Sequence, residues 1–337
     1  MAGDILISEI KEGDPIDGLF MVDNCSKRIS KNNRAYLKFQ LSDMSGSIEA
    51  VAWDEAMEKN PDTKKVSSGD YISLAGKSSV NRYTNKVEIS ISSLNIISDA
   101  EVDPALFLPS TDKDIDELKK ELMELIGKVS DNDYRRLLKI LFDDHEFLGQ
   151  FTLAPAAKNY HHAYLGGLLE HSVSVATLAI LLSSFYGNVD ESLMITGAIL
   201  HDVGKIKEFD YSKRIDYSTE GRLKGHIVIG NEIAEKAMDK LQEFPKEKRN
   251  ALSHLILSHQ GELEFGAAVR PKTKEAVILS IIDNVDAKIN GFIEIAKKYS
   301  NDSEWTDYQS MFQDFLYIGP KKIEEEIEQL KLVDKDK

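Results

Sequence analysis

The sequence predicts a multidomain protein in which an N-terminal all-β barrel is followed by an all-α helical bundle. The chain has 337 residues, which is enough for two or three domains. Before about residue 100 the hydrophobic pattern has the two-residue period of strands, and after residue 111 it repeats every three or four residues, as in helices. The expected parts are the barrel (1–100), a linker (101–110), the bundle (111–320) and a charged C-terminal helix or tail (321–337).

Five short strand-like runs make up the first part. They cover residues 18–22, 36–41, 47–53, 71–76 and 86–91, with a short helical stretch at 55–59. The turn Asp43-Met44-Ser45-Gly46 separates the second and third runs and predicts a hairpin. Five strands with one intervening helix are typical of a small Greek-key barrel of the OB type.

The second part begins where the composition changes, at Leu108-Pro109-Ser110-Thr111. Thr111 is followed by acidic residues, which predicts a capped helix start. Helical spacing of apolar residues then recurs at 115–126, 134–142, 164–182, 191–200, 227–241, 249–258 and 274–296. The tail is a charged amphipathic segment suited to surface packing or self-association, so a homo-oligomer is one expectation.

Composition limits the class of protein. The chain is 42% hydrophobic with 8 prolines and 20 glycines, which is typical of globular domains. The single cysteine, Cys25, rules out a disulfide framework and a cysteine-based zinc module. The N-terminus lacks a signal-peptide pattern and no uninterrupted 18-residue apolar run occurs, so we expect a cytoplasmic protein without a membrane span.

The net charge of −15 argues against a protein that coats nucleic acid through bulk positive potential. Residues 1–100 carry 12 bases and 15 acids, a net charge of −3, whereas the rest carries 30 bases and 42 acids, a net charge of −12. A narrow basic groove in the first part is therefore still compatible with the composition.

Histidines are concentrated in the second part, where seven of the eight fall between residues 161 and 259. His201 and Asp202 are adjacent at the end of an apolar helix. Imidazole and carboxylate together are the ligands of divalent metals such as Mn, Fe, Co, Ni or Zn. A carboxylate can bridge two ions, and such pairs activate water and bind a phosphoryl group. A lone histidine is more often a core residue, but this clustering favours a metal site.

Four of these residues match, in order, the H…HD…D signature of the HD-domain metal phosphohydrolases: His171, His201-Asp202 and Asp283. Longer strings at 161–171, 201–205, 258–262 and 270–273 extend the match. With the leading OB-type barrel, the chain from about residue 10 to 315 resembles the YhaM-type 3′→5′ exoribonucleases, also called the CMP-binding-factor family.

This resemblance implies a divalent transition-metal centre, with two ions and Mn first, and with Co, Fe, Ni or Zn as alternatives. It implies that His171, His201, Asp202 and Asp283 hold the first ion, that Asp202 bridges, and that His226 and His259 hold the second. Asp202 and Lys205 are then the catalytic residues, with Lys205 contacting a phosphate oxygen.

One position departs from the family. Many relatives have a second histidine where this chain has Gln260, and glutamine is a poor ligand for a transition metal. The second ion is therefore expected to be held more loosely. His254 is an additional ligand or, alternatively, a core histidine.

Substrate contacts are expected from His162, Arg270 and Lys272. His162 either binds a phosphate or supports a ligand, and Arg270 and Lys272 either hold a 3′-terminal nucleotide or form a plain surface loop. Residues expected to orient the ligands from behind are Glu170, Asn284, Asp286 and Lys288.

The predicted barrel carries a basic and aromatic segment. Expected nucleic-acid-binding residues are Lys27, Arg28, Lys31, Arg34, Tyr36, Lys38, Trp53 and Tyr83. In the alternating run 36–41, Tyr36 and Lys38 point away from the face that Leu37 and Phe39 give to the core. The alternative is a protein-docking or oligomerising barrel.

The sequence therefore favours a metal-dependent 3′→5′ exoribonuclease that hydrolyses single-stranded RNA, with single-stranded DNA as a second substrate, to nucleoside 5′-monophosphates. The polarity and the preference for RNA are implied by the resemblance alone. Two alternatives stay open: a phosphodiesterase acting on nucleotides or cyclic dinucleotides, and a non-catalytic DNA- or RNA-binding factor.

Overall fold

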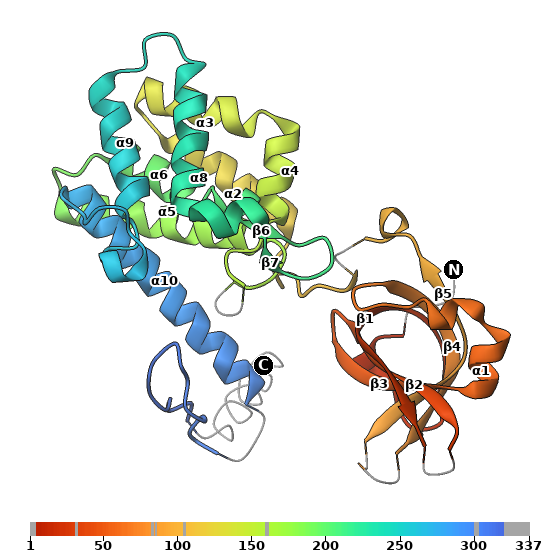
Figure 1. Cartoon of the computed structure of the whole chain (residues 1–337). Coiled ribbons are helices and arrows are strands. Elements are labelled where there is room, and N and C mark those ends of the chain that lie inside the picture. Colours follow the sequence, from red (N-terminus) through yellow and green to blue (C-terminus); the bar gives the residue numbers. More distant parts are fainter. Residues whose placement is uncertain are drawn as a thin grey trace, which may run out of the picture. The chain divides into compact units, whose positions relative to one another are not determined.

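The computed structural model describes residues 5–30, 33–81, 84, 86–103, 106–158, 162–299 and 303–319. The chain divides into two compact units (Figure 1). The barrel unit comprises Met1–Asp112 and Phe209–Thr219, and the helical unit comprises Lys113–Glu208 and Glu220–Lys337. The predicted tail, 321–337, lies outside the described residues.

The barrel unit contains a closed five-stranded barrel, which confirms the OB-type prediction. Its strands are β1 (Pro15–Ile29), β2 (Ala35–Asp43), β3 (Gly46–Trp53), β4 (Tyr71–Val80) and β5 (Val87–Ile97), in the order β1-β2-β3-β5-β4. The β3–β5 pair is parallel and the other pairs are antiparallel. Helix α1 (Asp54–Lys59) follows β3, and short 3₁₀ turns occur at Ile7–Glu9, Pro61–Lys64 and Asp99–Glu101.

Alternation along β2 decides which side chains fill the barrel. Leu37, Phe39 and Leu41 are buried, whereas Tyr36 and Lys38 are half-buried on the outer face. Burying each such apolar side chain contributes about 1.5–3 kcal/mol. Cys25 packs against the same core.

A short hairpin from the second half of the sequence belongs to the barrel unit. It consists of β6 (Phe209–Asp210) and β7 (Asp216–Tyr217). The Tyr71 hydroxyl donates to the Ser212 carbonyl (2.8 Å), and Lys213 Nζ lies 2.9 Å from Asp99 Oδ2. The prediction that residues 111–320 form the bundle is wrong for this segment, because nothing in an eleven-residue stretch indicates its distant partner.

The helical unit confirms the predicted all-α second part. Its helices are α2 (Ile115–Lys128), α3 (Asn132–Phe142), α4 (His145–Leu153), α5 (Gly167–Tyr186), α6 (Glu191–Leu200), α7 (Lys205–Glu208), α8 (Thr219–Asp239), α9 (Lys246–Ser258) and α10 (Lys274–Lys298), with a 3₁₀ turn at Leu263–Phe265. The first helix is capped by Asp114, which accepts from the Asp116 and Glu117 amides, and not by Thr111 as predicted.

Helix α5 lies at the centre of the bundle and contacts α2, α4, α6 and α10. It is long and apolar enough to cross a membrane by length and composition, with a mean hydropathy of 1.5 over 18 residues. Its burial among four helices accounts for that composition, because a helix that is apolar all round belongs in a core.

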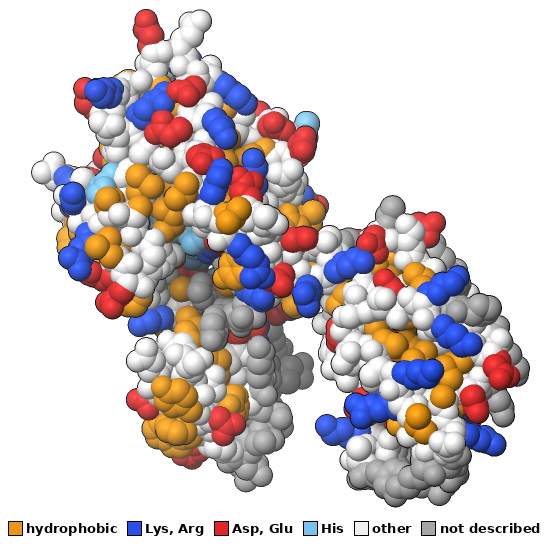
Figure 2. Space-filling view, in the orientation of Figure 1, with side chains coloured by type: hydrophobic (Ala, Val, Ile, Leu, Met, Phe, Trp, Pro, Cys, Tyr) orange, Lys and Arg blue, Asp and Glu red, His pale blue; other side chains and the backbone are white. Residues whose placement is uncertain are grey.

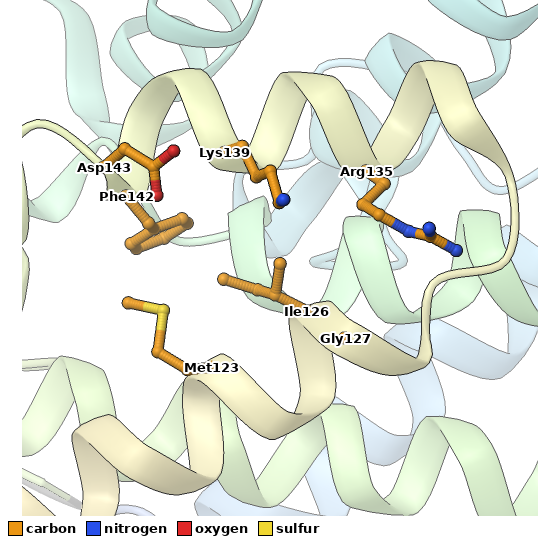
Figure 3. A pocket seen from close by; sticks show the side chains of 7 residues that line it. All are labelled: Met123, Ile126, Gly127, Arg135, Lys139, Phe142 and Asp143. Carbon is orange, nitrogen blue, oxygen red and sulfur yellow. The ribbon is translucent and has the colours of Figure 1, made fainter.

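The face of the helical unit seen in Figure 2 carries charged side chains of both signs. Between α2 and α3 lies a pocket of about 290 Å³ (Figure 3), lined by Met123, Ile126, Gly127, Arg135, Lys139, Phe142 and Asp143. The Arg135 guanidinium donates from Nε to the Val129 carbonyl (2.6 Å), which ties α3 to the end of α2. This pocket contains none of the histidines.

The last described segment, 303–319, folds back onto the C-terminal half of α10. The Phe292 and Phe312 rings lie 6.1 Å apart, and a Cβ on Gly291 would lie 2.7 Å from Met311 Sδ. A side chain at 291 would push the flexible end of Met311 aside.

Candidate metal centre

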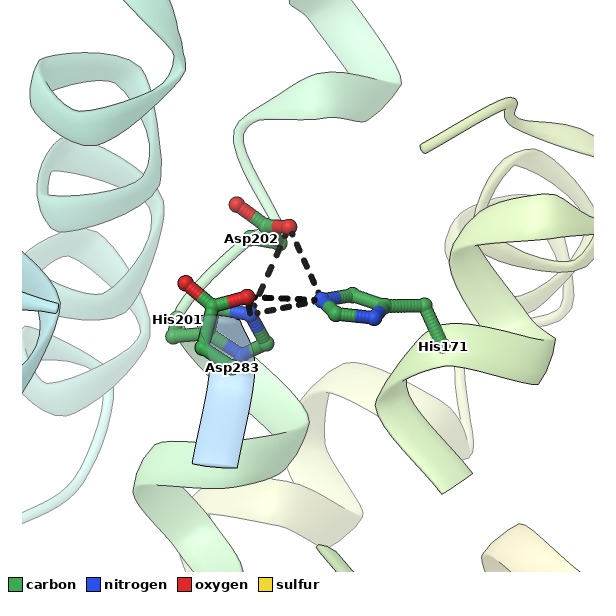
Figure 4. A group of neighbouring side chains, drawn as sticks. All are labelled: His171, His201, Asp202 and Asp283. Atoms are coloured by element: carbon green, nitrogen blue, oxygen red, sulfur yellow. Dashed lines mark hydrogen bonds and ion pairs between the residues drawn. The ribbon is translucent and has the colours of Figure 1, made fainter. Parts of the chain in front are cut away.

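Four side chains from three helices converge on one point inside the helical unit (Figure 4). His171 comes from α5, His201 and Asp202 from the end of α6, and Asp283 from α10. His171 Nε2 lies 3.1 Å from His201 Nε2, 3.4 Å from Asp202 Oδ2 and 3.2 Å from Asp283 Oδ1. All four residues are buried, so their polar atoms face one another and not bulk water.

A second group shares Asp202. Its other oxygen, Oδ1, lies 3.4 Å from His226 Nε2 and 3.4 Å from His259 Nε2. Asp202 Oδ1 and His226 Nε2 are buried atoms with no hydrogen-bond partner among the described residues. Leaving such atoms unsatisfied costs roughly 1–3 kcal/mol each, so a ligand is expected between them.

The four metal-facing imidazoles are oriented from behind. Each Nδ1 contacts a carbonyl or carboxylate oxygen, and such oxygens accept hydrogen bonds but do not donate them. The acceptors are Asp286 Oδ2 for His171 (2.8 Å), the Ala198 carbonyl for His201 (2.8 Å), Glu208 Oε1 for His226 (3.1 Å) and the Ile256 carbonyl for His259 (2.7 Å). Each Nδ1 therefore carries the proton, and in the neutral ring Nε2 presents a lone pair to the centre.

This donor set fits divalent metal ions. Ligand atoms about 2.1 Å from one ion lie about 3.0–3.4 Å apart, depending on geometry. The separations in both groups, 3.1 to 3.7 Å, are close to that range. Histidine nitrogen together with carboxylate oxygen suits transition metals better than Ca²⁺ or Mg²⁺.

Electrostatics at the centre favours positive charge. Burial raises the pKa values of Asp202 and Asp283, but neighbouring cationic groups outweigh it and hold both pKa values well below the ordinary range. Burial lowers the pKa of His201, yet Asp202 and Asp283 outweigh it and raise this pKa to about 9. The carboxylates thus stabilise a cation at Nε2, and a metal ion can take the place of those protons.

Lys205 follows the pair by one turn and is buried beside it. Its Nζ lies 2.5 Å from Asp202 Oδ2, the oxygen that belongs to the first group. The glycine between them, Gly204, permits a close helix approach, since a Cβ there would lie 2.0 Å from the His226 carbonyl oxygen. The His-Asp-x-Gly-Lys string therefore combines two candidate ligands, a close contact with α8 and a cation.

Behind His171 lies a chain of buried polar side chains. Asp286 also contacts His162 Nε2 (3.0 Å), and His162 Nδ1 lies 2.8 Å from the Tyr164 hydroxyl. That hydroxyl donates to Glu170 Oε2 (2.9 Å), whose other oxygen lies 3.0 Å from Lys113 Nζ.

The His162 side chain is 1% exposed and both its ring nitrogens have protein contacts. This burial favours the second alternative for His162, support of a ligand, over contact with a phosphate. Of the predicted orienting residues, Asp286 and Glu170 take part in this chain, whereas Asn284 and Lys288 are exposed on α10 and do not.

The structure keeps His254 out of both groups. Its Nε2 accepts a hydrogen bond from the Lys272 amide (2.9 Å). His254 lies five residues before His259 on α9, so the two side chains point in different directions from the helix. The expectation of a further ligand at 254 is corrected accordingly. The Lys272 backbone is thereby anchored, while its side chain is exposed.

Two remaining predictions concern the rim of the centre. Arg270 is exposed, and its Nε donates to Glu262 Oε2 (2.8 Å), so it is paired on the surface and no described contact brings it to the metal groups. Gln260 lies beside the second group, with Nε2 3.2 Å from His259 Nε2. The Gln260 amide is therefore close enough to His259 to take part in the second group.

The barrel carries an aromatic and basic outer face. Tyr36 on β2 is paired with Trp53 on β3 and with Arg28 on β1, and the two rings lie 5.0 Å apart. Trp53 is 42% exposed. Lys38 shares this face but is paired with Glu49 at 2.8 Å.

The other predicted binding residues divide into two sets. Lys27 and Arg34 are exposed at the same end of the β1–β2 hairpin. Lys31 and Tyr83 lie outside the described residues.

Two contributors to the centre were not identified from the sequence. Glu208 accepts from both the backbone amide (2.9 Å) and Nδ1 of His226, across the kink that Gly225 makes in α8 with φ 72°. Tyr164 joins His162 to Glu170. The one sequence signal was their position inside or beside the matched strings, which is too weak to assign a contact.

Comparison with known proteins agrees with this geometry. Residues 168–288 match the HD domain family, and residues 21–97 match a family described as an OB-fold nucleic acid binding domain. The chain is 33% identical over 291 residues to the 3′-5′ exoribonuclease YhaM of Bacillus subtilis, covering 86% of this chain and 90% of that protein.

Among solved structures, the second OB-fold domain of replication protein A from Methanococcus maripaludis matches with 22% identity and a TM-score of 0.24, covering 28% of this chain and 96% of that one. The HD domain of the L. monocytogenes phosphodiesterase PgpH matches with 19% identity and a TM-score of 0.28, covering 50% and 76%. The extent and identity of the match to the Bacillus protein, together with both domain matches, show that this chain belongs to the YhaM family of 3′-5′ exoribonucleases.

Proposed function

We propose that this protein is a metal-dependent 3′→5′ exoribonuclease that shortens single-stranded RNA and releases nucleoside 5′-monophosphates, with single-stranded DNA as a weaker substrate. The observation that carries the proposal is the pair of His/Asp groups joined through Asp202, one oxygen in each group. Family membership supports the polarity and the choice of RNA.

The two groups would hold two divalent ions, for which we propose Mn²⁺. His171, His201 and Asp283 would hold the first and His226 and His259 the second. When bound, such a pair activates water and stabilises the charge of a phosphoryl group.

The chain's own side chains have three tasks around these ions. Asp202 fixes the distance between the two His/Asp groups, because its two carboxylate oxygens belong to different groups and are a fixed distance apart. Lys205, buried beside Asp202, supplies positive charge close to the point where charge develops on the phosphate during hydrolysis. The acceptors behind the imidazoles keep each Nε2 available as a ligand.

The barrel would bind the strand. Exposed aromatic rings can stack on nucleobases of any identity, at about 1–3 kcal/mol per base. Lysine and arginine side chains beside the rings can contact the phosphates. Tyr36 and Trp53 supply the rings. Lys27, Arg28 and Arg34 supply positive charge at the same end of the β1–β2 hairpin. This arrangement favours single strands, whose bases are accessible, over duplexes.

The test is digestion of RNA labelled at its 5′ end, in the presence of Mn²⁺, with products separated by length and by thin-layer chromatography. The wild type should give a ladder of labelled products that shorten gradually, with unlabelled nucleoside 5′-monophosphates. His201→Ala and Asp202→Asn should lower the rate by at least about a hundredfold, because each removes a ligand.

The matched control is His145→Ala, which removes the exposed histidine on α4 and should leave the rate unchanged. Immediate release of a labelled mononucleotide would indicate the opposite polarity. Intact RNA with all metals tried, or hydrolysis of small nucleotides alone, would contradict the proposal.

A further inference from the structure

The side of α10 away from the metal centre carries a row of exposed aliphatic side chains. They recur every four residues and are between 44% and 58% exposed: Val277, Ile281, Val285, Ile289 and Ile293. We call this row the α10 ridge. Asp283 is buried on the same helix, about half a turn from its ridge neighbours Ile281 and Val285. Single exposed apolar residues are ordinary, but a contiguous row of five indicates an interaction surface.

A second apolar surface lies beside the C-terminal half of α10. Residues 303–319 are joined by the bridges Trp305–Tyr317 and Gln309–Asp314, and we call this segment the aromatic hairpin. Four of its rings are between 52% and 57% exposed: Trp305, Tyr308, Phe315 and Tyr317. Apolar side chains gather at this end of the helical unit in Figure 2. Exposed tryptophan and tyrosine are typical of the centres of protein interfaces.

Charge distinguishes a protein partner from nucleic acid. The aromatic hairpin contains Glu304, Asp307 and Asp314 and no lysine or arginine, so phosphates would be repelled from its rings. Helix α10, in contrast, exposes Lys288 in its C-terminal half, whereas Lys297 there pairs with Glu294 at 3.2 Å. The acidic hairpin of one chain is thus complementary to Lys288 on α10 of another.

We propose that the α10 ridge and the aromatic hairpin form a two-fold interface between two copies of this chain. Residues four apart form ridges that pack into the grooves of an identical helix, with an interaxial angle of about −50°. In such an isologous contact each hairpin meets the helix of the other copy. The exposed parts of the nine side chains amount to roughly 800 Å² per copy, which is the size of a standard stable interface.

The test is the mass of the full-length protein in solution, measured by light scattering and by sedimentation over a hundredfold range of concentration. The expected mass is twice the chain mass of 37.8 kDa. Ile281→Lys and Ile289→Lys should each shift the protein to monomer, because each buries a charge in an apolar interface. The matched control, Leu153→Lys at a 50% exposed position on α4, should stay dimeric.

A milder variant avoids any loss of folding. Lys288→Glu changes only an exposed charge and should raise the dissociation constant of the dimer about tenfold by repelling the acidic hairpin. Fluorescence gives an independent signal, since the chain has two tryptophans and Trp53→Phe leaves Trp305 as the reporter. Its emission should move to shorter wavelength as the concentration rises.

Three results would overturn the proposal. One is a monomer at every concentration, and another is a dimer that persists in Ile281→Lys, Ile289→Lys and Lys288→Glu. The third is a monomeric full chain whose truncation after Gly319 becomes dimeric, which would assign the ridge to the chain's own residues 320–337. None of these measurements depends on nuclease activity, so the interface and the proposed reaction fail or stand separately.

Discussion

At the scale of single residues, the centre depends on what holds each ligand as much as on the ligand itself. Two imidazoles are held by backbone carbonyls and two by carboxylates, Asp286 and Glu208. Carbonyls belong to the helix and are present in any sequence. The two carboxylates, in contrast, can be removed by substitution, so their effect on metal binding can be tested.

Asp286→Asn should weaken metal binding without removing a ligand. The change takes away the negative charge that holds the His171 Nδ1 proton, and such outer contacts typically contribute 10- to 100-fold in metal affinity. Competition with a coloured chelator would measure the affinity. Asn284→Ala, an exposed change two residues away, should leave it unaltered. Equal affinities in the two variants would show that Asp286 does not orient His171.

The residues of the two groups could be picked out from the sequence because they lie in local strings of recognisable order and spacing. Tyr164, Glu208 and the role of His162 could not, because each depends on which distant oxygen a ring nitrogen meets. His254 was considered as a ligand because it lies five residues before His259 and could compensate for Gln260. Its contact with the Lys272 amide depends on the position of the loop before α10, which the sequence does not indicate.

At the scale of elements, close helix contacts and helix caps decide where the ligands lie. Gly204 follows Asp202 and touches α8, which carries His226. The N-termini of α2, α3, α4 and α6 are all capped by aspartates. These caps are sequence features, yet their exact positions depend on local geometry, as the shift from Thr111 to Asp114 shows.

Gly204→Ala should separate α8 from the turn after α6. The added Cβ would lie 2.0 Å from the His226 carbonyl oxygen and 2.6 Å from the Gly230 nitrogen, which forces the backbone to move. We expect a loss of about 1–3 kcal/mol in the free energy of unfolding and one bound ion fewer per chain, as measured by urea denaturation and metal analysis.

Gly149→Ala is the matched control, since it lies in α4 with nothing within 4 Å of the new Cβ. It should stabilise the protein by about 0.5–1 kcal/mol. A Gly204→Ala variant with full stability and two ions would show that α8 is free to shift.

Asp131→Ala should destabilise α3 in a pH-dependent way. Asp131 caps that helix and lies 2.5 Å from Lys248 Nζ. Burial raises its pKa, but Lys248 and two backbone amides outweigh it and lower the pKa overall. A lowered folded-state pKa means that the contribution is present above the ordinary carboxyl pKa and is lost as the pH falls through the folded value.

The expected loss at neutral pH is about 1 kcal/mol, and the difference from wild type should shrink as the pH falls below about 4. Urea titrations at neutral and acidic pH would measure both. A difference that grows on acidification would contradict the assigned sign.

At the scale of the whole molecule, charge and metal decide how the two units work. The excess of acids lies after residue 100, whereas exposed bases lie at one end of the β1–β2 hairpin. The charge counts could predict this division, and the two-residue hydrophobic period could predict the barrel strands. It could not predict that residues 209–219 join the barrel unit, since a hairpin of two-residue strands has no distinctive periodicity.

RNA affinity should fall with salt in proportion to the few basic residues that contact phosphates. For single strands the logarithm of the binding constant falls by about 0.7 per contact for each tenfold rise in salt. In an Asp202→Asn background, which prevents digestion, Arg28→Ala should reduce this slope by about 0.7. Lys120→Ala, an exposed change on α2, should not alter it, and an unchanged slope for Arg28→Ala would place the strand elsewhere.

Metal binding should stabilise the helical unit. Without ions, the carboxylates of Asp202, Asp283 and Asp286 are crowded in a buried centre. At Mn²⁺ a hundredfold above its dissociation constant, stability should rise by about 2.7 kcal/mol per site. Thermal melts with Mn²⁺ and with a chelator would measure the shift, and Asp202→Asn should abolish most of it. Melting that is insensitive to a chelator would contradict a structural contribution of the metal.

The shared carboxylate of Asp202 also makes the two binding events thermodynamically interdependent. Whatever the occupancy of one position does to the affinity of the other, the reverse effect must have the same magnitude. The group with His171, His201 and Asp283 offers the larger set of donors, whereas the other contributes two histidines and a neighbouring amide. The two positions should therefore bind metal in sequence, the larger donor set first. The concentration of free metal then sets the occupancy of the weaker position and, through it, the rate of turnover.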